Sequence, residues 1–352
     1  MPKVAVILIN YKDYAKKYLP ECIASLRVQS YPKDSFKVFI VDNATSPETA
    51  EYLRATAPEA EIILEEKNTG FALGNNLAME RALAANYDYI VLFNMDTIAD
   101  PDWLRELVST AEADKDAGAV QSLIRLHPET DKINSLGNQL HFLGFGFCEG
   151  YGEKISDLKS PISRKFFYAS GASVLYPAKV LREVGLFDPE FFMYHEDTDL
   201  SWRIGQAGYK IVLAEKSVMY HKYQFSRSIL QFYYMERNRL IMLFENFRLG
   251  TLVLIFFPFL FMELGMLGFA ALRGMFITKV KAYGYFLYWK NWRRMIKNKR
   301  AKAKLRKVSD RKLSRLIVGK LEFQEIANPI LRYIVNPVFN LYWRVVRNLI
   351  FW

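Results

Sequence analysis

The sequence predicts an α/β protein in which a mostly parallel sheet carries helices on both faces and is followed by a helical C-terminal region. Short apolar runs rich in β-branched residues alternate with helix-period stretches over the first two thirds of the chain. Strands buried on both faces of a parallel sheet have this continuous apolar character, and strand–helix alternation implies right-handed crossovers. Helix-like sequence then dominates from Ser226 onward. For 352 residues we therefore expect one large domain over 1–225 and a helical extension over 226–352.

The alternation defines the expected strands and helices of the first part of the chain. The expected strands span 4–9, 37–41, 62–64, 89–93 and 119–124. The expected helices span 19–28, 48–56, 72–85 and 103–115. Asp100-Pro101, just before the last of these helices, supplies a cap followed by proline, which is a typical helix start.

The alternation of expected strands and helices stops after Leu126. Five glycines between Gly137 and Gly152 interrupt aromatic residues, which indicates short antiparallel strands or a mobile loop. Plain turn chemistry explains these glycines more simply than a lid over a substrate does. Alternation resumes with expected strands at 166–175, 210–213 and 218–221 and expected helices at 178–184 and 197–206.

Charge and cysteine content indicate which partner and which cellular compartment the protein has. The net charge of +11 indicates an anionic partner, and the excess lies in the C-terminal third, where eleven Lys or Arg stand between Arg293 and Lys312 against a single Asp310. Cys22 and Cys148 are too few for a disulfide framework and lack the paired spacing of a thiolate metal site. The apolar run 4–9 is too short for a signal-peptide core. We therefore expect a cytoplasmic protein with reduced thiols.

Polar residues stand at the ends of four expected strands. They are Asn10, Asp42-Asn43, Asn68-Thr69-Gly70 and Asn94-Met95-Asp96. Each alone is ordinary turn chemistry, but ligands bind outside the carboxyl ends of parallel strands, so four such groups predict a shared cleft. Carboxylate, amide and glycine backbone together suit a nucleotide. Neither the G-x-G-x-x-G fingerprint nor the P-loop is present, so the phosphate charge must be met in another way.

A divalent cation held by Asp96 would meet that charge. Oxygen ligands suit Mg²⁺ or Mn²⁺, and Mg²⁺ usually binds through one or two carboxylates plus substrate phosphates. His221 ends the last expected strand and could add a neutral imidazole ligand, although a lone histidine is more often structural.

A second acidic group, Glu196-Asp197-Thr198-Asp199, follows the bulky apolar stretch 191–194. Carboxylates backed by apolar surface can have a raised pKa, which suits a general base that works near neutral pH. The simpler alternative is helix capping by Asp197, with Glu196 and Asp199 favoured by the helix dipole. Capping and catalysis are compatible, so both interpretations stay open.

Together these residues resemble the family 2 glycosyltransferases, in particular the branch with bacterial rhamnosyltransferases and related enzymes of cell-surface polysaccharide assembly. The matching strings are Ile9-Asn10-Tyr11, 41–44, 68–76, 92–97, 192–200, Ala207-Gly208-Tyr209 and His221. Their order and spacing agree with the family over residues 3 to 225. The resemblance implies a GT-A fold, a nucleotide-diphosphate sugar donor and inversion at the anomeric carbon.

The resemblance also implies roles for single residues. Asp96 and His221 would bind Mg²⁺ or Mn²⁺, and Asp197, beside Glu196, would be the catalytic base. The donor-binding set would be Asn10, Asp42, Asn43, Gly70, Asn75 and Asn94, with Asp42 contacting the nucleotide base and Asn10 and Asn75 lining the nucleotide pocket. We add Arg203 to this set because it lies near enough in sequence to the acidic pair to reach the diphosphate. The wider family often has Asp-x-Asp where this chain has Asn94-x-Asp96. A weaker metal site that depends on the donor is therefore expected.

The apolar segment 251–272 is long enough to cross a hydrocarbon core, which needs ~20 residues. Pro258 and Glu263 interrupt this segment. Basic residues flank both of its ends, and such residues tend to stay in the cytoplasm, so both ends are expected on the same side of the membrane. We therefore expect a broken helix that re-enters or lies in the interface, in preference to a single span. Residues 283–292 and 333–352 mix aromatics with Arg and Lys, as interfacial amphipathic helices do, or else pack against the catalytic domain.

The leading hypothesis is an inverting, metal-dependent glycosyltransferase at the cytoplasmic face of the cell membrane. It would move a sugar from a nucleotide-diphosphate donor, with dTDP-rhamnose as the family-level suggestion, to a lipid-linked or glycan acceptor. Anionic membrane lipids are the expected partners of the basic run, and nucleic acid is not. Two alternatives remain: a non-catalytic, membrane-anchored nucleotide-sugar binding protein, suggested by Asn94, and a nucleic-acid-binding protein, suggested by residues 281–312.

Overall fold

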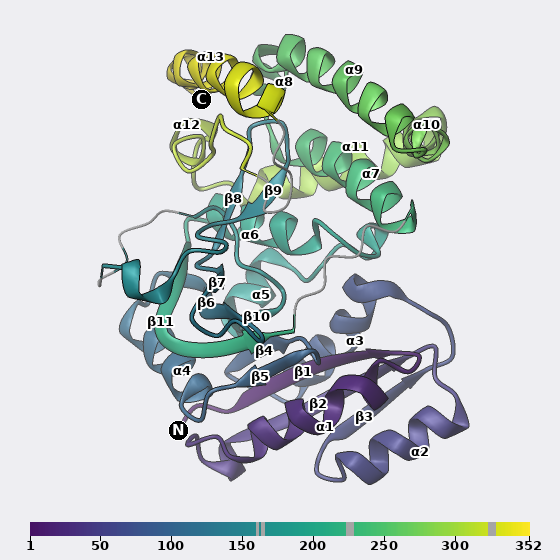
Figure 1. The fold of residues 1–352 in the computed structure, drawn as a ribbon, viewed down its shortest axis with the longest axis vertical. Helices are drawn as coiled ribbons and strands as arrows, with labels where there is room; N and C mark the ends of the chain where they lie inside the picture. The colour runs from purple at the N-terminus through teal and green to yellow at the C-terminus, as the bar shows by residue number, and fades with distance from the viewer. Residues whose placement is uncertain (160–161, 163–165, 223–228, 323–328) are drawn as a thin grey trace.

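The computed structural model describes residues 1–159, 162, 166–222, 229–322 and 329–352 (Figure 1). Its centre is a nine-stranded mixed sheet. Across the sheet the strands are β3 (Glu61–Glu65), β2 (Phe36–Asn43), β1 (Val4–Tyr11), β4 (Tyr89–Phe93), β10 (Ser173–Pro177), β6 (Ala117–Leu126), β11 (Lys210–His221) and β5 (Thr97–Ala99), with β7 (Ile133–Ser135) paired to β6. Strands β10, β5 and β7 run antiparallel to their neighbours. The other six share one direction, as the sequence predicts.

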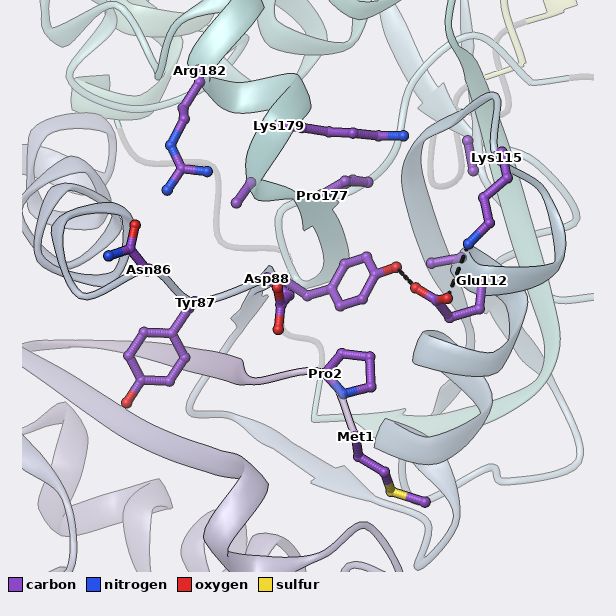
Figure 2. A pocket seen from close by; sticks show the side chains of 14 residues that line it. Met1, Pro2, Asn86, Tyr87, Asp88, Glu112, Lys115, Pro177, Lys179 and Arg182 are labelled. Carbon is purple, nitrogen blue, oxygen red and sulfur yellow. Dashed lines mark hydrogen bonds and ion pairs between the residues drawn. The ribbon is translucent and has the colours of Figure 1, made fainter.

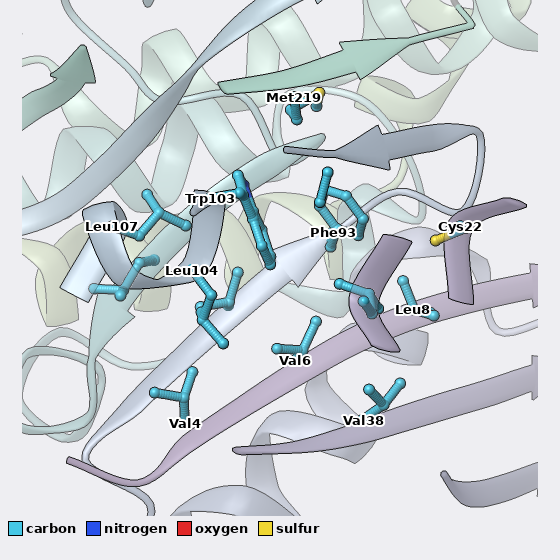
Figure 3. Packing of buried hydrophobic residues seen from close by; sticks show 14 of the residues in the cluster. Val4, Val6, Leu8, Cys22, Val38, Phe93, Trp103, Leu104, Leu107 and Met219 are labelled. Carbon is cyan, nitrogen blue, oxygen red and sulfur yellow. The ribbon is translucent and has the colours of Figure 1, made fainter. Parts of the chain in front are cut away.

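Helices cover both faces of the sheet. They are α1 (Tyr14–Arg27), α2 (Pro47–Thr56), α3 (Gly70–Ala84), α4 (Trp103–Ala113), α5 (Ala178–Val184) and α6 (Glu196–Gln206). Helices α1, α2 and α4 share a core with Val4 and Val6 of β1, in which Trp103 is fully buried (Figure 3). Helices α3, α5 and α6 share the opposite core with Ala5 and Ile7. Because alternate residues of β1 enter two different cores, the run 4–9 of this strand is apolar throughout.

Several predicted boundaries need correction. Helix α4 begins at Trp103, and Asp102, not Asp100, precedes it. Helix α1 begins at Tyr14, five residues before the predicted start, and contains Pro20. The strand predicted at 166–175 is β10, which begins only at Ser173. The two strands predicted at 210–213 and 218–221 are the single strand β11, whose pairing with β6 is irregular between Ala214 and Val218.

The glycine-rich stretch forms short antiparallel strands, which confirms one of the two predicted forms. Strands β8 (Asn138–Leu140) and β9 (Gly146–Cys148) pair with each other outside the main sheet. Gly137 has a φ of +126°, and a Cβ there would lie 2.4 Å from the ring of Phe166. Glycine is therefore required at this position both by backbone conformation and by space.

The C-terminal part of the chain is helical. It contains α7 (Ile229–Asn246), α8 (Leu249–Leu254), α9 (Phe256–Leu272), α10 (Phe276–Gly284), α11 (Trp289–Leu305), α12 (Asp310–Leu313) and α13 (Asn336–Leu349). The apolar segment 251–272 is broken at Ile255, between α8 and α9, as expected for an interrupted helix. In the ranges that the structure describes, no helix is both long and apolar enough to span a bilayer. The predicted boundary at 225 and 226 lies outside the described residues.

The C-terminal helices share a core with the sheet domain. Phe191 and Trp202 of the sheet domain belong to the same buried cluster as Phe247 and Trp343 of the C-terminal helices. The buried carboxylate of Asp199, in α6, is contacted by Lys302 of α11 at 2.5 Å between Nζ and Oδ1. The two parts are therefore joined by apolar packing and by buried charge.

The carboxylate inside the apolar segment is explained by intramolecular pairing. Glu263 is buried and forms ion pairs with Arg239 at 2.5 Å and with Lys279 at 2.8 Å, and Tyr283 donates to it at 2.6 Å. Glu236 completes this cluster as a second carboxylate bound to both cations. A buried charge is tolerated when it is paired and hydrogen-bonded in this way.

Candidate active site

Asp96 and His221 meet at the end of β4, as the sequence predicts. The turn 94–96 leads from β4 into β5, and β5 pairs with β11 so that Thr97 lies opposite His221. The amide of Lys222 donates to the carbonyl of Asp96 at 2.9 Å, which fixes this register. As a result, Nε2 of His221 lies 3.4 Å from Oδ1 of Asp96.

The chemistry of this pair suits a divalent cation. Within the described part of the chain, Oδ1 of Asp96 is buried and accepts no hydrogen bond. Burial alone would raise the pKa of Asp96, but the His221 ring and the Tyr14 hydroxyl outweigh burial and hold the pKa below its usual range. No group of three or more His, Cys, Asp or Glu suited to a metal occurs among the described residues. Among the described residues this pair would supply two ligands, and a cation would need the donor diphosphate or water for the others.

The acidic pair Glu196-Asp197 begins helix α6 and lies next to the turn after β4. Oδ2 of Asp197 accepts from the amide of Gly171 at 3.2 Å. The next residue, Ala172, accepts through its carbonyl from the amide of Asn94 at 2.9 Å. Two hydrogen bonds and two consecutive residues, Gly171 and Ala172, therefore connect Asp197 to the Asn94–Asp96 turn. The structure brings the predicted metal ligands and the predicted base to the same edge of the sheet.

The environment of the acidic pair disfavours its ionised form. Burial, together with the negative charge of Asp197, raises the pKa of Glu196 well above its usual range. Burial also raises the pKa of Asp197, although hydrogen bonds from Gly171 and Thr198 oppose the shift. Asp197 keeps part of its surface exposed, whereas Glu196 is buried and its Oε2 has no hydrogen-bond partner. The exposed member of the pair is therefore the one that a substrate can reach.

The loop that precedes α6 has a strained backbone. Phe192, Tyr194 and His195 have φ values of 62°, 66° and 69°, in the left-handed region that side chains other than glycine rarely adopt. Each such residue costs of order 1–3 kcal/mol and persists only when its surroundings over-determine it. The loop therefore needs an external support.

Asn238 of α7 provides that support. Its side-chain amide donates at 2.8 Å to each of three loop carbonyls, those of Phe191, Met193 and Tyr194. Arg237 fixes the Asn238 side chain by donating to its Oδ1 at 2.9 Å. Asn238 is not among the site residues that the sequence predicts. Its only indication in the sequence is a polar run, 236–239, inside a largely apolar helix, and this run is buried.

The predicted donor-binding residues of the first strands are bonded to one another and to the loops that follow these strands. Asn10 and Asp42 are fully buried and bonded to each other at 2.7 Å, and Asp42 also accepts from Thr45 at 2.6 Å and Thr49 at 2.9 Å. Asn10 further accepts from the amide of Ala15 at 2.7 Å. Their polar atoms thus hold the loops that follow β1 and β2.

Asn43, Gly70 and Asn75 hold the start of α3. Asn43 donates to the carbonyl of Gly70 at 2.9 Å, and Asn75 donates to that of Phe71 at 2.8 Å. Gly70 has a φ of +77°, and a Cβ there would lie 2.4 Å from the carbonyl oxygen of Phe192. This close approach joins α3 to the strained loop, and only glycine permits it.

The assignment of Arg203 to the donor site needs correction. Its guanidinium is buried, pairs with Asp199 at 2.9 Å, and donates to the carbonyls of Val184 at 2.6 Å and Leu186 at 2.7 Å. These bonds hold the guanidinium between α6 and the end of α5, where internal partners occupy it. Proximity in sequence to the acidic pair does not place its side chain in the cleft, because i+4 spacing on a helix favours pairing with Asp199.

A separate hollow lies at the opposite ends of the strands. It has a volume of about 640 Å³ and is lined by residues that include Pro2, Asp88 and Arg182, with Tyr89 bonded to Glu112 beside it (Figure 2). Pro2 and Asp88 precede β1 and β4, so this hollow faces the amino ends of the parallel strands. Ligands of such sheets bind at the carboxyl ends, which is where the acidic pair and Asp96 meet.

A mixed sheet flanked by helices, with its acidic groups at the carboxyl ends of the strands, is consistent with the GT-A class of glycosyltransferases. A profile described as "Glycosyl transferase family 2" matches residues 5–184, more than half of the chain. The chain belongs to this family and is a glycosyltransferase.

Individual proteins support the same family. N-acetylglucosaminyl-diphospho-decaprenol L-rhamnosyltransferase of Mycobacterium tuberculosis is 25% identical over 238 residues, which cover 62% of this chain and 75% of that protein. The structure of GalNAc-T7 with UDP, GalNAc and Mn²⁺ matches with a TM-score of 0.54 at 13% identity, over 69% of this chain and 47% of that one. TarS 1–349 of S. aureus in complex with UDP matches with a TM-score of 0.50 at 16% identity, over 98% of this chain and 90% of that one. At these identities the two structures show the fold alone.

Proposed function

We propose that the protein transfers a sugar, with inversion, from a nucleotide-diphosphate donor to a hydroxyl of a membrane or lipid-linked glycan acceptor in cell-surface polysaccharide synthesis. The mycobacterial relative is named for a rhamnosyl transfer onto a diphospho-decaprenol-linked sugar. This name supports dTDP-rhamnose as the first donor to test and an isoprenoid diphosphate sugar as the first acceptor.

One observation carries the proposal: the hydrogen-bonded connection from Asp197 through Gly171 and Ala172 to Asn94. An inverting transfer needs a base on one side of the anomeric carbon and charge stabilisation of the diphosphate on the other. The connection holds candidate groups for both tasks at one edge of the sheet.

Asp197 is the proposed base. It takes the proton of the acceptor hydroxyl, the hydroxyl oxygen bonds to the anomeric carbon, and the bond from that carbon to the diphosphate oxygen breaks with its electron pair on the diphosphate. A raised pKa improves the carboxylate as a proton acceptor. The hydrogen bonds from Gly171 and Thr198 orient the carboxylate. Glu196, buried behind it, helps to set its charge state.

Asp96 and His221 are the proposed ligands of Mg²⁺ or Mn²⁺. When bound, such a cation neutralises charge on the departing diphosphate. The presence of Mn²⁺ and UDP in the GalNAc-T7 structure supports this proposal. Asn94 stands where a second carboxylate would add charge, so we expect the cation to bind together with the donor. Asn10, Asp42, Asn43, Gly70 and Asn75 would position the loops that contact the nucleotide.

We also propose that the protein works at the cytoplasmic face of the membrane, attached by its C-terminal helices without crossing. Twenty-two of the twenty-eight large apolar side chains that are exposed among the described residues lie between Leu249 and Phe351. On α13 they form one stripe, Val338, Leu341, Val345 and Leu349, and α9 lies beside α13 through the rings of Phe261 and Phe339 (Figure 1). Exposed apolar patches of this extent mark interaction sites.

Exposed basic residues next to this surface support anionic lipids as its partners. Arg293, Lys297, Arg300 and Lys304 are exposed along one side of α11, whereas Lys302 and Arg306 of the same basic run are used in internal ion pairs. Exposed Lys and Arg each contribute about 1 kcal/mol to attraction by an anionic surface. Co-sedimentation with liposomes should increase with the fraction of phosphatidylglycerol and decrease with salt, and equal binding to neutral liposomes would argue against the lipid assignment.

The test of the proposed reaction is a thermal-shift screen of nucleotide sugars with and without Mn²⁺, followed by a transfer assay with the stabilising donor. A ligand at a hundredfold excess over its Kd stabilises the folded state by about 2.7 kcal/mol, so a specific donor is readily detected. We expect dTDP-rhamnose to raise the melting temperature more with Mn²⁺ than without it. A screen in which no nucleotide sugar stabilises the protein would remove the proposal.

A further inference from the structure

A second hollow lies inside the C-terminal helical region, away from the acidic pair. It has a volume of about 640 Å³, within the range of about 300–1,000 Å³ that is typical of ligand pockets. Its walls come from α7, α8, α9 and α11 and from the segment 283–286. We call it the helical pocket.

The helical pocket offers almost nothing to a polar ligand. Thirteen of its fifteen lining residues are apolar, and the other two are Glu263 and Tyr283. Tyr283 donates to Glu263, and Glu263 is further paired with Arg239 and Lys279. The indole N–H of Trp292 in the wall is also satisfied, since it donates to the carbonyl of Phe286 at 2.7 Å. A hydrocarbon is therefore the chemistry that fits.

The pocket opens onto the exposed apolar surface. Phe256, Leu260 and Leu264 of α9 line it and are at the same time 53%, 48% and 61% exposed. One side of these side chains faces the pocket and the other faces the surroundings. A chain that leaves an apolar phase at α9 can thus enter the pocket without crossing a polar barrier.

The opposite walls belong to the helices that support the strained loop before α6. This loop carries the carbonyls bound by Asn238, and we call it the catalytic loop because it precedes the proposed base. Leu240 of α7 lines the pocket and is two residues from Asn238, which holds the loop carbonyls. Met295 of α11 lines the pocket beside Arg294, which pairs at 2.8 Å with Asp188 just before the loop. The pocket therefore lies between the apolar surface and the catalytic loop.

We propose that the helical pocket receives the isoprenoid chain of the lipid-linked acceptor, and so guides its sugar headgroup toward Asp197. This inference rests on the proposed acceptor class and adds a binding site to it. Burial of a hydrocarbon contributes about 0.8 kcal/mol per methylene group, so a few carbons in the pocket suffice to select a lipid-linked acceptor over a free sugar. The isoprenoid chain is chosen over a phospholipid acyl chain because only the acceptor has to reach the catalytic loop.

The test is direct binding of a fluorescent geranylgeranyl phosphate to the full chain, below the micellar concentration and followed by fluorescence anisotropy. Leu267 of α9 lines the pocket, whereas Leu272 of the same helix does not and is 89% exposed. Leu267→Trp fills the pocket, and Leu272→Trp is the matched control with the same change in size. We expect saturable binding that Leu267→Trp weakens at least about tenfold, while Leu272→Trp binds as the unchanged protein does.

A fluorescent palmitate is the second arm of the experiment and should bind at least about tenfold more weakly than the isoprenoid. Equal affinity for palmitate would overturn the isoprenoid assignment, and so would the absence of saturable binding or an equal effect of the two variants. Melting curves of both variants exclude unfolding as the cause. No donor or turnover is involved, so failure here leaves the nucleotide-sugar screen intact as the separate test of the proposed reaction.

Discussion

The two halves of the candidate site are held in different ways. Asp96 and His221 are placed by strand pairing, because β5 and β11 set them opposite each other in the sheet. Asp197 follows a strained loop that depends on Asn238, a residue of a helix more than forty positions later in the chain. The half that contains Asp96 and His221 is thus built within the sheet domain, whereas the half that contains Asp197 also requires the C-terminal helices.

This difference predicts that the two halves can be damaged separately. A change in the sheet-held half should affect the need for a cation, and a change in α7 should affect turnover with little effect on donor binding. The four predictions below test that separation.

The largest effect is expected from Asp197→Asn, which removes the proposed base while it keeps the shape of the side chain. General-base catalysis contributes about a hundred- to ten-thousandfold, so kcat should fall by about that range. Donor affinity in the thermal-shift assay should remain close to that of the unchanged protein. Normal turnover of this variant would show that a group other than Asp197 is the catalytic base.

The next effect is expected from Asp96→Asn, which removes the negative charge beside His221. The Mn²⁺ concentration for half-maximal transfer should rise at least about tenfold, corresponding to a loss of about 1.4 kcal/mol. Asp116→Asn changes an exposed carboxylate outside the site and serves as the control. An unchanged requirement for Mn²⁺ in the Asp96 variant would contradict the proposed ligand set.

A smaller effect on turnover is expected from Asn238→Ala. Loss of three hydrogen bonds to loop carbonyls leaves buried acceptors unpaired, at about 1–3 kcal/mol each when no water replaces the donor. We expect kcat to fall about tenfold and the Mn²⁺ requirement to stay the same. Asn348→Ala, on the exposed side of α13, should change neither quantity. A shift in Mn²⁺ requirement with Asn238→Ala would show that the two halves are coupled.

The smallest effect concerns stability and pH. Because burial raises the pKa of Asp197 in the folded state, the folded protein binds more protons than the unfolded chain, and this contribution to stability is lost as pH rises through the raised pKa. Asp197→Asn should therefore have a slightly higher melting temperature than the unchanged protein at neutral pH. The difference should shrink below the ordinary Asp pKa of about 3.9. An equal difference at all pH values would contradict the raised pKa.

The sequence predicts the sheet half well for a physical reason. Residues such as Val4 to Ile9 are buried on both faces, so their apolar pattern is local and visible, and the polar residues that end the strands are visible for the same reason. The order of the strands thus predicts that Asp96 and His221 lie close together. It does not predict that β10 runs antiparallel between β4 and β6, because a short apolar run has the same pattern in either direction.

The base half was predicted only in part. The sequence predicts a role for the acidic run that begins at Glu196, but it does not predict one for Asn238. The partners of Asn238 are backbone carbonyls more than forty residues away, and every residue has a backbone carbonyl, so the sequence does not mark them. Arg203 was misplaced for a related reason, since its partners are Asp199 and the carbonyls after α5. Likewise, anionic lipids are the partners that the sequence predicts for the basic run, yet Lys302 of this run pairs with a buried carboxylate.

That pairing of Lys302 with Asp199 limits how this enzyme can be cut or recombined. A fragment that ends after the sheet would keep the pair of Asp199 with Arg203 but would lose Lys302 from the other carboxylate oxygen, and removal of one partner from a buried ion-pair cluster is destabilising. Chimaeras that exchange acceptor preference between homologues should therefore carry α6, α7 and α11 together as one inherited unit. If the proposed function holds, the helices that would meet the membrane cannot change independently of the helix that begins with the proposed base.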